Sequence, residues 1–290
     1  MPPLGFVGLG QMGGRMARHL LDDGHELVAF DLDSAALDRA VEAGATAAES
    51  AADVAERADV VFLSLPGPAA VEAVVEDLAD AVDGESVLVD LSTTTPTTSR
   101  NAADRLDDSG ATVLGAPVSG GTSGAEAGTL TVMAGGDAAT VEACRPYFEA
   151  FAADVFHIGD DPGHGNAVKL LNNYLSNVAL VATSEAITLG REAGLDPERM
   201  CEVFNVSSGQ NTSTMEKFPE RILPGEDIGF ALGLMEKDMR LLSQFAEEYR
   251  TPLLVESVVH NQVSAARARF GDDGDMGEIY DYVESTVLGE

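Results

Sequence analysis

A single lysine inside a long apolar stretch is the residue of this sequence best suited to acid–base chemistry. Lysine occurs only three times in 290 residues, and Lys169 lies in a mostly apolar segment that predicts a helix from about Asn166 to Ala193. Unlike arginine, lysine can lose its proton when it is desolvated. Asn173 follows four residues later and therefore shares a helix face with Lys169. The pair predicts a proton-transfer site, although polar contacts between packed helices would use the same residue types.

The N-terminal segment carries a pattern typical of dinucleotide binding. An apolar run precedes a G-x-G-x-x-G motif, which consists of Gly8, Leu9, Gly10, Gln11, Met12 and Gly13. A helical pattern follows, so the pyrophosphate of a dinucleotide is expected at the start of that helix. Asp31 ends the next predicted strand, 23 residues after Gly8, close to the spacing for an acid that binds the ribose 2′-hydroxyl. Because a 2′-phosphate would meet this charge and no arginine stands beside Asp31, we expect NAD rather than NADP.

Near-continuous apolar strands alternate with helices through the first half of the chain. This alternation predicts an α/β domain with a mostly parallel, doubly wound sheet that is covered on both faces. Leu65, Pro66 and Thr93 directly follow two of these strands. Ligands of such sheets lie beyond the carboxyl ends of the strands, so these residues are expected at the cofactor edge. Turn and capping chemistry alone would also explain the run of threonines from Thr93.

A glycine-rich segment follows the next strand. Ser119, Gly120 and Gly121 offer a hydroxyl group and closely spaced backbone N–H groups, which suit a carboxylate. We expect a loop from here to Gly124, and a flexible turn without a ligand remains the alternative.

The second half of the chain predicts helices only, which gives two domains, residues 1–162 and residues 163–290. We expect Ser207–Thr214 to form a polar loop and Thr251-Pro252 to begin a helix. The five histidines and two cysteines show no metal-ligand spacing, so no metal is expected.

The amino-acid composition limits the kinds of molecule that the protein is expected to bind. The chain has 49 acidic and 17 basic residues, a net charge of −32, and would repel nucleic acids and anionic membranes. Dispersed acids and scarce lysine are typical of proteins adapted to a salt-rich cytoplasm. No apolar run is long enough to span a membrane and no signal peptide is evident, so we expect a cytoplasmic protein.

Four segments together resemble the β-hydroxyacid dehydrogenase family. They are residues 5–17 (GFVGLGQMGGRMA), 115–136 (GAPVSGGTSGAEAGTLTVMAGG), 163–173 (GHGNAVKLLNN) and 234–242 (LMEKDMRLL). The resemblance implies a Rossmann domain, an all-helical C-terminal domain, an active site in the cleft between them, and a homodimer or homotetramer. It also implies roles for individual residues: Lys169 as the catalytic lysine, Asn173 as its substrate-orienting neighbour, Ser119, Gly120 and Gly121 as carboxylate ligands, and Leu65, Pro66, Thr93 and Lys237 as cofactor contacts.

The resemblance implies interconversion of a small 3-hydroxy acid and its semialdehyde. Lys169 would exchange the hydroxyl proton, and burial is expected to lower its pKa. The leading substrates are 3-hydroxyisobutyrate and tartronate semialdehyde. The related 6-phosphogluconate dehydrogenases carry a histidine where this chain has Asn172. Oxidation of a phosphosugar and a non-catalytic NAD-binding module are the alternatives.

Overall fold

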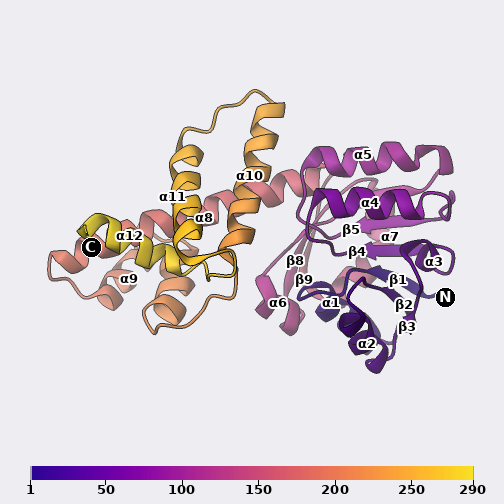
Figure 1. Ribbon diagram of the computed structural model, residues 1–290, viewed down its shortest axis with the longest axis horizontal. Coiled ribbons are helices and arrows are strands. Elements are labelled where there is room, and N and C mark those ends of the chain that lie inside the picture. Colours follow the sequence, from indigo (N-terminus) through magenta and orange to yellow (C-terminus); the bar gives the residue numbers. More distant parts are fainter. Residues whose placement is uncertain (1, 290) are drawn as a thin grey trace. The chain divides into compact units, whose positions relative to one another are not determined.

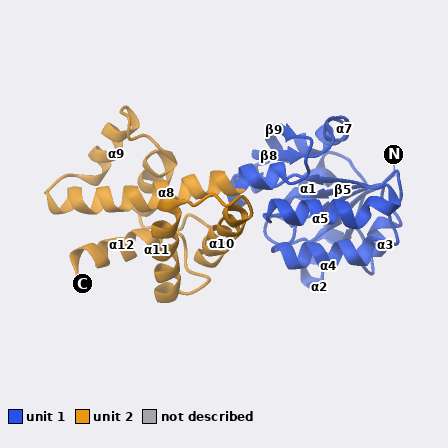
Figure 2. Ribbon diagram, turned by 90° about the horizontal axis from the view of Figure 1, so that it is seen from above, with its two compact units in different colours: residues 1–169 blue, residues 170–290 orange. Residues whose placement is uncertain are grey.

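A computed structural model describes residues 2–289 of the chain. The chain forms two compact units, one up to Lys169 and one from Leu170 onward (Figure 2). The division between the two units, after Lys169, falls inside one long helix that begins at His164. The N-terminal unit is α/β and the C-terminal unit is helical, as the sequence predicted.

Within residues 2–289, the N-terminal unit contains one nine-stranded sheet with the order β3-β2-β1-β4-β5-β6-β8-β7, and β9 pairs with β8. The strands are Leu4–Val7 (β1), Leu27–Phe30 (β2), Thr46–Ala47 (β3), Val60–Leu63 (β4), Val87–Asp90 (β5), Thr112–Gly115 (β6), Val118–Ser119 (β7), Leu130–Gly135 (β8) and Ala152–Gly159 (β9). The pairs from β3 to β6 are parallel, whereas β8 runs antiparallel to β6 and β7. The prediction of a mostly parallel sheet is therefore confirmed.

Helices cover both faces of this sheet, which is why its central strands are almost wholly apolar. The helices are Gly13–Asp22 (α1), Ser34–Glu42 (α2), Ala51–Ala55 (α3), Pro68–Leu78 (α4), Pro96–Leu106 (α5), Gly121–Ala127 (α6) and Ala138–Glu149 (α7), with a 3₁₀ turn at Asp107–Ser109. One core joins the sheet to α1, α2 and α7, and a second joins it to α3, α4 and α5. Figure 1 shows α4 and α5 on one face and α1 and α2 on the other.

The C-terminal unit packs its helices around a core rich in methionine and aromatic side chains. The helices are His164–Glu192 (α8, which begins in the N-terminal unit), Pro197–Asn205 (α9), Ser213–Ile222 (η2), Leu232–Glu248 (α10), Leu254–Phe270 (α11) and Glu278–Leu288 (α12). The segment η2 is a π-helix, a rare form that is frequent at functional sites. Asp196 caps α9 and Pro197 is its first residue, as predicted from the sequence.

Three local predictions were wrong. The glycine-rich loop ends at Gly120, because α6 already begins at Gly121. The polar segment Ser207–Thr214 is not a loop throughout, because Asn211 accepts a hydrogen bond from the Ser213 N–H and the π-helix starts there. The helix expected at Thr251-Pro252 begins only at Leu254, without a side-chain cap.

Each unit holds one free cysteine in its core. Cys144 packs in the α1/α2/α7 core and Cys201 packs in the C-terminal core. Burial raises the pKa of the Cys144 thiol to about 11 and also raises the pKa of the Cys201 thiol. Within residues 2–289, no helix is both long and apolar enough to cross a membrane, and no cluster of three potential metal ligands occurs.

Candidate active site

The glycine-rich turn links β1 to α1 with the geometry that the motif predicted. Gly8 has a φ of 93°, a conformation that favours glycine. A Cβ atom at Gly13 would lie 1.9 Å from the Gly8 carbonyl oxygen, so only glycine allows α1 to start this close to the turn. At Gly10, no atom lies within 4 Å of such a Cβ. Gly10 thus leaves open space at the start of α1, where a pyrophosphate would bind.

Asp31, directly after the neighbouring strand β2, binds the backbone of this turn through its carboxylate. Its Oδ2 accepts a hydrogen bond from the Leu9 N–H at 2.5 Å, and its Oδ1 accepts one from the Asp33 N–H at 2.7 Å. An ionised carboxylate has about four acceptor positions, so Asp31 can still accept bonds from a ribose. The contact between Leu9 and Asp31 brings the two parts of the predicted motif together.

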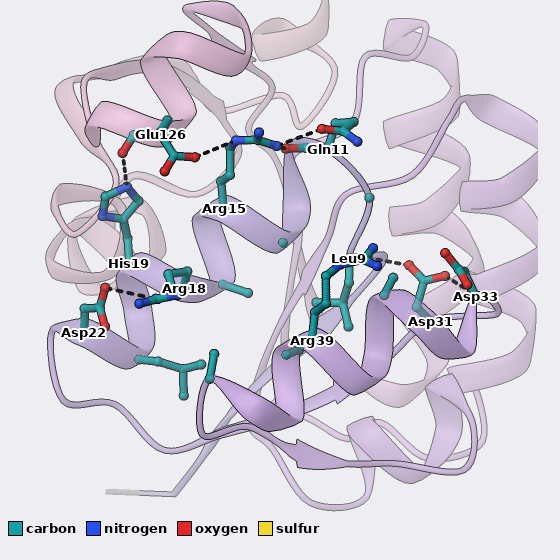
Figure 3. Close-up of a pocket in the computed structure, with 17 residues that line it drawn as sticks. Leu9, Gln11, Arg15, Arg18, His19, Asp22, Asp31, Asp33, Arg39 and Glu126 are labelled. Carbon is teal, nitrogen blue, oxygen red and sulfur yellow. Dashed lines mark hydrogen bonds and ion pairs between the residues drawn. The ribbon is translucent and has the colours of Figure 1, made fainter.

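A pocket of about 850 Å³ opens beside the turn, between α1 and α2 (Figure 3). Leu9, Gly10, Gln11 and Asp31 line it together with three arginines, Arg15, Arg18 and Arg39. Arg15 donates to the Gln11 carbonyl oxygen and pairs with Glu126, and Arg18 lies 3.4 Å from Asp22. The guanidinium group of Arg39 forms no hydrogen bond or ion pair within the part of the chain that the structure describes. Arg39, eight residues after Asp31, therefore lines the same pocket, although the sequence has no arginine directly beside Asp31.

The ends of β4 and β5 form the rest of this edge. These strands are parallel neighbours, so Leu65, Pro66 and Thr93 follow at the same side of the sheet. Ser92 Oγ accepts a hydrogen bond from the Leu65 N–H at 2.9 Å and thereby joins the two loops. Asp90 accepts a hydrogen bond from the Ser92 N–H at 3.0 Å. Burial raises the pKa of Asp90 to about 6, against the opposing effect of its hydrogen bonds from Ser92.

The first turns of α8 are fastened to the same edge within the N-terminal unit. The fully buried Asn166 accepts a hydrogen bond from the Thr94 N–H at 2.9 Å and donates to Ser99 Oγ at 3.1 Å. A Cβ atom at Gly165 would lie about 2 Å from the Gly115 carbonyl oxygen, so α8 begins in tight contact with the end of β6. Lys169 lies one turn after Asn166 and is 8% exposed. Lys169 is thus placed on a turn that is fixed to the loop carrying Thr93.

Ser119 ends β7, beside the start of α6. Gly120 and Gly121 have φ values of 133° and 64°, a backbone conformation that favours glycine. The three residues predicted as carboxylate ligands therefore lie on a strand-to-helix turn.

Asn173 lies one turn beyond Lys169 on α8, in the C-terminal unit. Its Nδ2 donates to Asp238 Oδ2 at 2.7 Å, and Asp238 is 5% exposed. Lys237 Nζ lies 3.3 Å from the other carboxylate oxygen of Asp238. Two residues predicted for the site, Asn173 and Lys237, are therefore connected through a third that the sequence did not single out.

Comparison with known proteins identifies the family. Residues 3–159 match the model described as "NAD binding domain of 6-phosphogluconate dehydrogenase", and residues 163–283 match "NAD-binding of NADP-dependent 3-hydroxyisobutyrate dehydrogenase". The 2-(hydroxymethyl)glutarate dehydrogenase of Eubacterium barkeri is 37% identical over 280 residues, 95% of this chain and 93% of the relative. The chain belongs to the β-hydroxyacid dehydrogenase family.

Two further members are similar over most of their length. The NAD-dependent L-serine dehydrogenase of Pseudomonas aeruginosa is 42% identical over 261 residues, 85% of this chain and 86% of the relative. The structure of the Mycobacterium tuberculosis 3-hydroxyisobutyrate dehydrogenase with L-serine superimposes with a TM-score of 0.91 at 29% identity, covering 97% and 98% of the two chains. As a β-hydroxyacid dehydrogenase, the protein uses a nicotinamide cofactor.

Sequence reasoning missed two buried carboxylates of this dehydrogenase, although each had a recognisable signal. Asp238 occupies the apolar face of α10, beside Met235, Met239 and Leu242. Asp90 ends a strand whose other residues are all apolar. A charged residue at an apolar position requires a partner, and in both cases the partner belongs to the candidate site.

Proposed function

We propose that this dehydrogenase interconverts a small 3-hydroxy acid and its semialdehyde, with Lys169 as the general acid–base. The observation that carries the proposal is the placement of a buried lysine on a helical turn that Asn166 fastens to the loop at the cofactor edge. Burial favours the neutral form of an amine, which can accept a proton. In a chain with only three lysines, Lys169 is the one fixed in this way.

Each predicted site residue has a separate role in the proposed reaction. The bound nicotinamide supplies the hydride acceptor in oxidation. Lys169 accepts the proton of the substrate hydroxyl group as the carbonyl forms, and returns it in the reverse direction. Asn173, held by Asp238, orients the hydroxyl group. The N–H groups at Gly120 and Gly121, with the hydroxyl group of Ser119, bind the substrate carboxylate.

The cofactor is expected to be NAD. Asp31 stands at the position that contacts the ribose 2′-hydroxyl and would repel a 2′-phosphate. Arg39 in the same pocket is the feature that favours NADP instead. The Asp31 carboxylate is held by two backbone N–H groups, whereas Arg39 is exposed on α2. We therefore expect the fixed charge of Asp31, rather than the exposed Arg39, to determine a preference for NAD over NADP.

Candidate substrates follow from the family and from the relatives. They are 3-hydroxyisobutyrate, tartronate semialdehyde, L-serine and 2-(hydroxymethyl)glutarate, which all carry the reacting hydroxyl or carbonyl group on the carbon β to a carboxylate. Oxidation of 6-phosphogluconate is the second candidate function, supported by the family model that matches residues 3–159. Asn172, at the position where that enzyme class carries a histidine, is exposed and disfavours it.

Initial rates of NAD and NADP reduction test the proposal, with 3-hydroxyisobutyrate, L-serine, 2-(hydroxymethyl)glutarate, 6-phosphogluconate and glycerate, the reduced form of tartronate semialdehyde, as substrates. The assays are run in molar KCl because the net charge of −32 requires screening. Lys169→Arg retains the charge but cannot release a proton, so it is expected to reduce kcat by roughly 10²- to 10⁴-fold. Leu171→Ala, an exposed change on another side of α8, serves as the control.

The outcomes separate the alternatives. Full activity of Lys169→Arg would exclude the lysine as the acid–base group. Turnover of 6-phosphogluconate would favour the phosphosugar reaction. Tight binding of NAD without turnover of any substrate would support a non-catalytic role.

A further inference from the structure

The start of α8 lies in close contact with the rest of the N-terminal unit. A Cβ atom at Gly163 would lie 2.7 Å from the Pro96 carbonyl oxygen, and one at Gly165 would lie 2.1 Å from the Met133 carbonyl oxygen. Only glycine allows the backbone of this segment to approach α5 and β8 so closely. Backbone contacts therefore fix the helix less than two turns before Lys169.

Asn166 extends this attachment with its side chain, which is fully buried. Its Oδ1 accepts a hydrogen bond from the Thr94 N–H at 2.9 Å, and its Nδ2 donates to Ser99 Oγ at 3.1 Å. A backbone N–H can only donate, so the amide oxygen must face Thr94 and the orientation of the amide is determined. Both partners belong to the segment that runs from the end of β5 into the first turn of α5. Asn166 thus joins α8 to this segment through two directional contacts.

The same segment also reaches the expected cofactor edge. Ser92 Oγ accepts a hydrogen bond from the Leu65 N–H, and the Thr94 N–H donates to Asn166. Between them stands Thr93, which is predicted to contact the cofactor. Three successive residues of one loop therefore connect the cofactor edge to α8.

Lys169 follows Asn166 by three residues in the helix. Side chains at this spacing are neighbours on one helix face, with Cβ atoms about 5–6 Å apart. The face of α8 that Asn166 attaches to the loop is therefore the face that carries Lys169. A change in this attachment would move the lysine relative to the loop at Thr93.

We propose that Asn166 is a positioning residue, which sets the place of the Lys169 amino group relative to the nicotinamide beside the loop at Thr93. This inference rests on the function proposed above, because it requires Lys169 to be the acid–base group. Asn166 acts through Lys169 and not by contact with the substrate. Since a misplacement of about 1 Å can cost about 100-fold in rate, loss of both hydrogen bonds is expected to lower kcat by roughly ten- to 100-fold.

Two substitutions at this position form a matched pair. Asn166→Ala removes both hydrogen bonds. Asn166→Asp keeps the acceptor for the Thr94 N–H and can still bond to Ser99 Oγ, because a hydroxyl group donates as well as accepts. We expect kcat to fall in Asn166→Ala and to be largely restored in Asn166→Asp at its own pH optimum.

Two further observations separate positioning from a general loss of structure. The dissociation constant for NAD should be unchanged in Asn166→Ala, because the glycine-rich turn and Asp31 are untouched. Ser184→Ala removes another buried hydrogen bond of α8, donated to the Leu180 carbonyl oxygen, and should leave kcat unchanged. Equal losses of kcat in Asn166→Ala and Ser184→Ala, or weaker NAD binding that accounts for the loss, would overturn the inference.

The decisive measurement adds Asn166→Ala to Lys169→Ala. The residual kcat of Lys169→Ala should not fall further, because no lysine is left to position. A further fall by the same factor as in the wild type would show a merely structural role and overturn the inference. Full activity of Lys169→Ala, or no turnover by the wild type, would instead refute the proposed function itself.

The solvent deuterium isotope effect on kcat decides the question if the residual rate of Lys169→Ala is too low to compare. Slower proton transfer to a misplaced Lys169 makes this step limit the rate, so the isotope effect should be larger in Asn166→Ala than in the wild type. An unchanged isotope effect beside a reduced kcat would overturn the inference.

Discussion

At the cofactor edge, the Leu9 N–H reaches Asp31 across 22 positions of the chain, whereas on α8 Asn173 depends on Asp238, 65 residues later. The first arrangement uses backbone groups whose direction follows from a strand, a tight turn and a helix. The second uses single side-chain contacts between helices: Asn173 with Asp238, and Ser176 with Lys217. Backbone geometry of the first kind tolerates many side chains, whereas a contact of the second kind is lost with a single substitution.

The largest effect is expected from a substitution that disrupts the backbone arrangement at the glycine-rich turn. In Gly13→Ala, the new Cβ atom would lie 1.9 Å from the Gly8 carbonyl oxygen, and such overpacking is expected to lower the free energy of unfolding by about 3 kcal/mol. In Gly10→Ala, the Cβ atom meets nothing within 4 Å, so stability should be retained while NAD binding weakens. Urea unfolding and NAD titration of both variants measure the two effects. Equal destabilisation by the two variants would contradict this division of roles.

The second prediction concerns the buried carboxyl group behind the cofactor edge. The pKa of Asp90 is raised from 3.8 to about 6. The folded state therefore holds its proton more tightly, and this contribution to stability is present below pH 4 and lost as the pH rises through 6. The loss amounts to about 3 kcal/mol. Asp90→Asn keeps the acceptor for the Ser92 N–H and should remove this decline, as urea unfolding between pH 4 and 7 would show. Parallel pH curves for the two proteins would refute the assignment.

The smallest effect is expected for the hydrogen bond between the Asn173 and Asp238 side chains, and it tests whether Asp238 positions Asn173. Because Asn173 and Asp238 share one hydrogen bond of 2.7 Å, the substitutions Asn173→Ala and Asp238→Asn should not act independently on kcat. A double-mutant cycle is expected to show a coupling of about ten-fold, or about 1.4 kcal/mol. Multiplicative losses in the double variant would show that Asp238 does not position Asn173.

The same contrast explains how far the sequence could predict the structure. The turn at Gly8, the position of Asp31 directly after β2 and the capped start of α9 follow from local patterns, and all three were confirmed. The pairing of Asn173 with Asp238 and of Ser176 with Lys217 could not be predicted, because no short sequence pattern indicates which helices pack together. Arg39 was missed for a related reason, since it enters the pocket only through the packing of α2 against α1.

Local errors occurred where residue type and conformation conflict. Glycines usually indicate a loop, yet Gly121 begins α6. The polar residues near Ser213 and the proline at position 219 disfavour a regular helix, and the chain forms a π-helix instead. The first of these departures lies in the segment that we propose to bind the substrate carboxylate.

The two cysteines give each unit its own chemical reporter. Cys144 and Cys201 are buried in separate cores, and burial raises both thiol pKa values, so neither should react readily with an alkylating reagent in the native state. Alkylation of each thiol therefore requires its own core to open. The modification rates of the two peptides, followed by mass spectrometry, would reveal which half of the dehydrogenase opens first as salt is withdrawn.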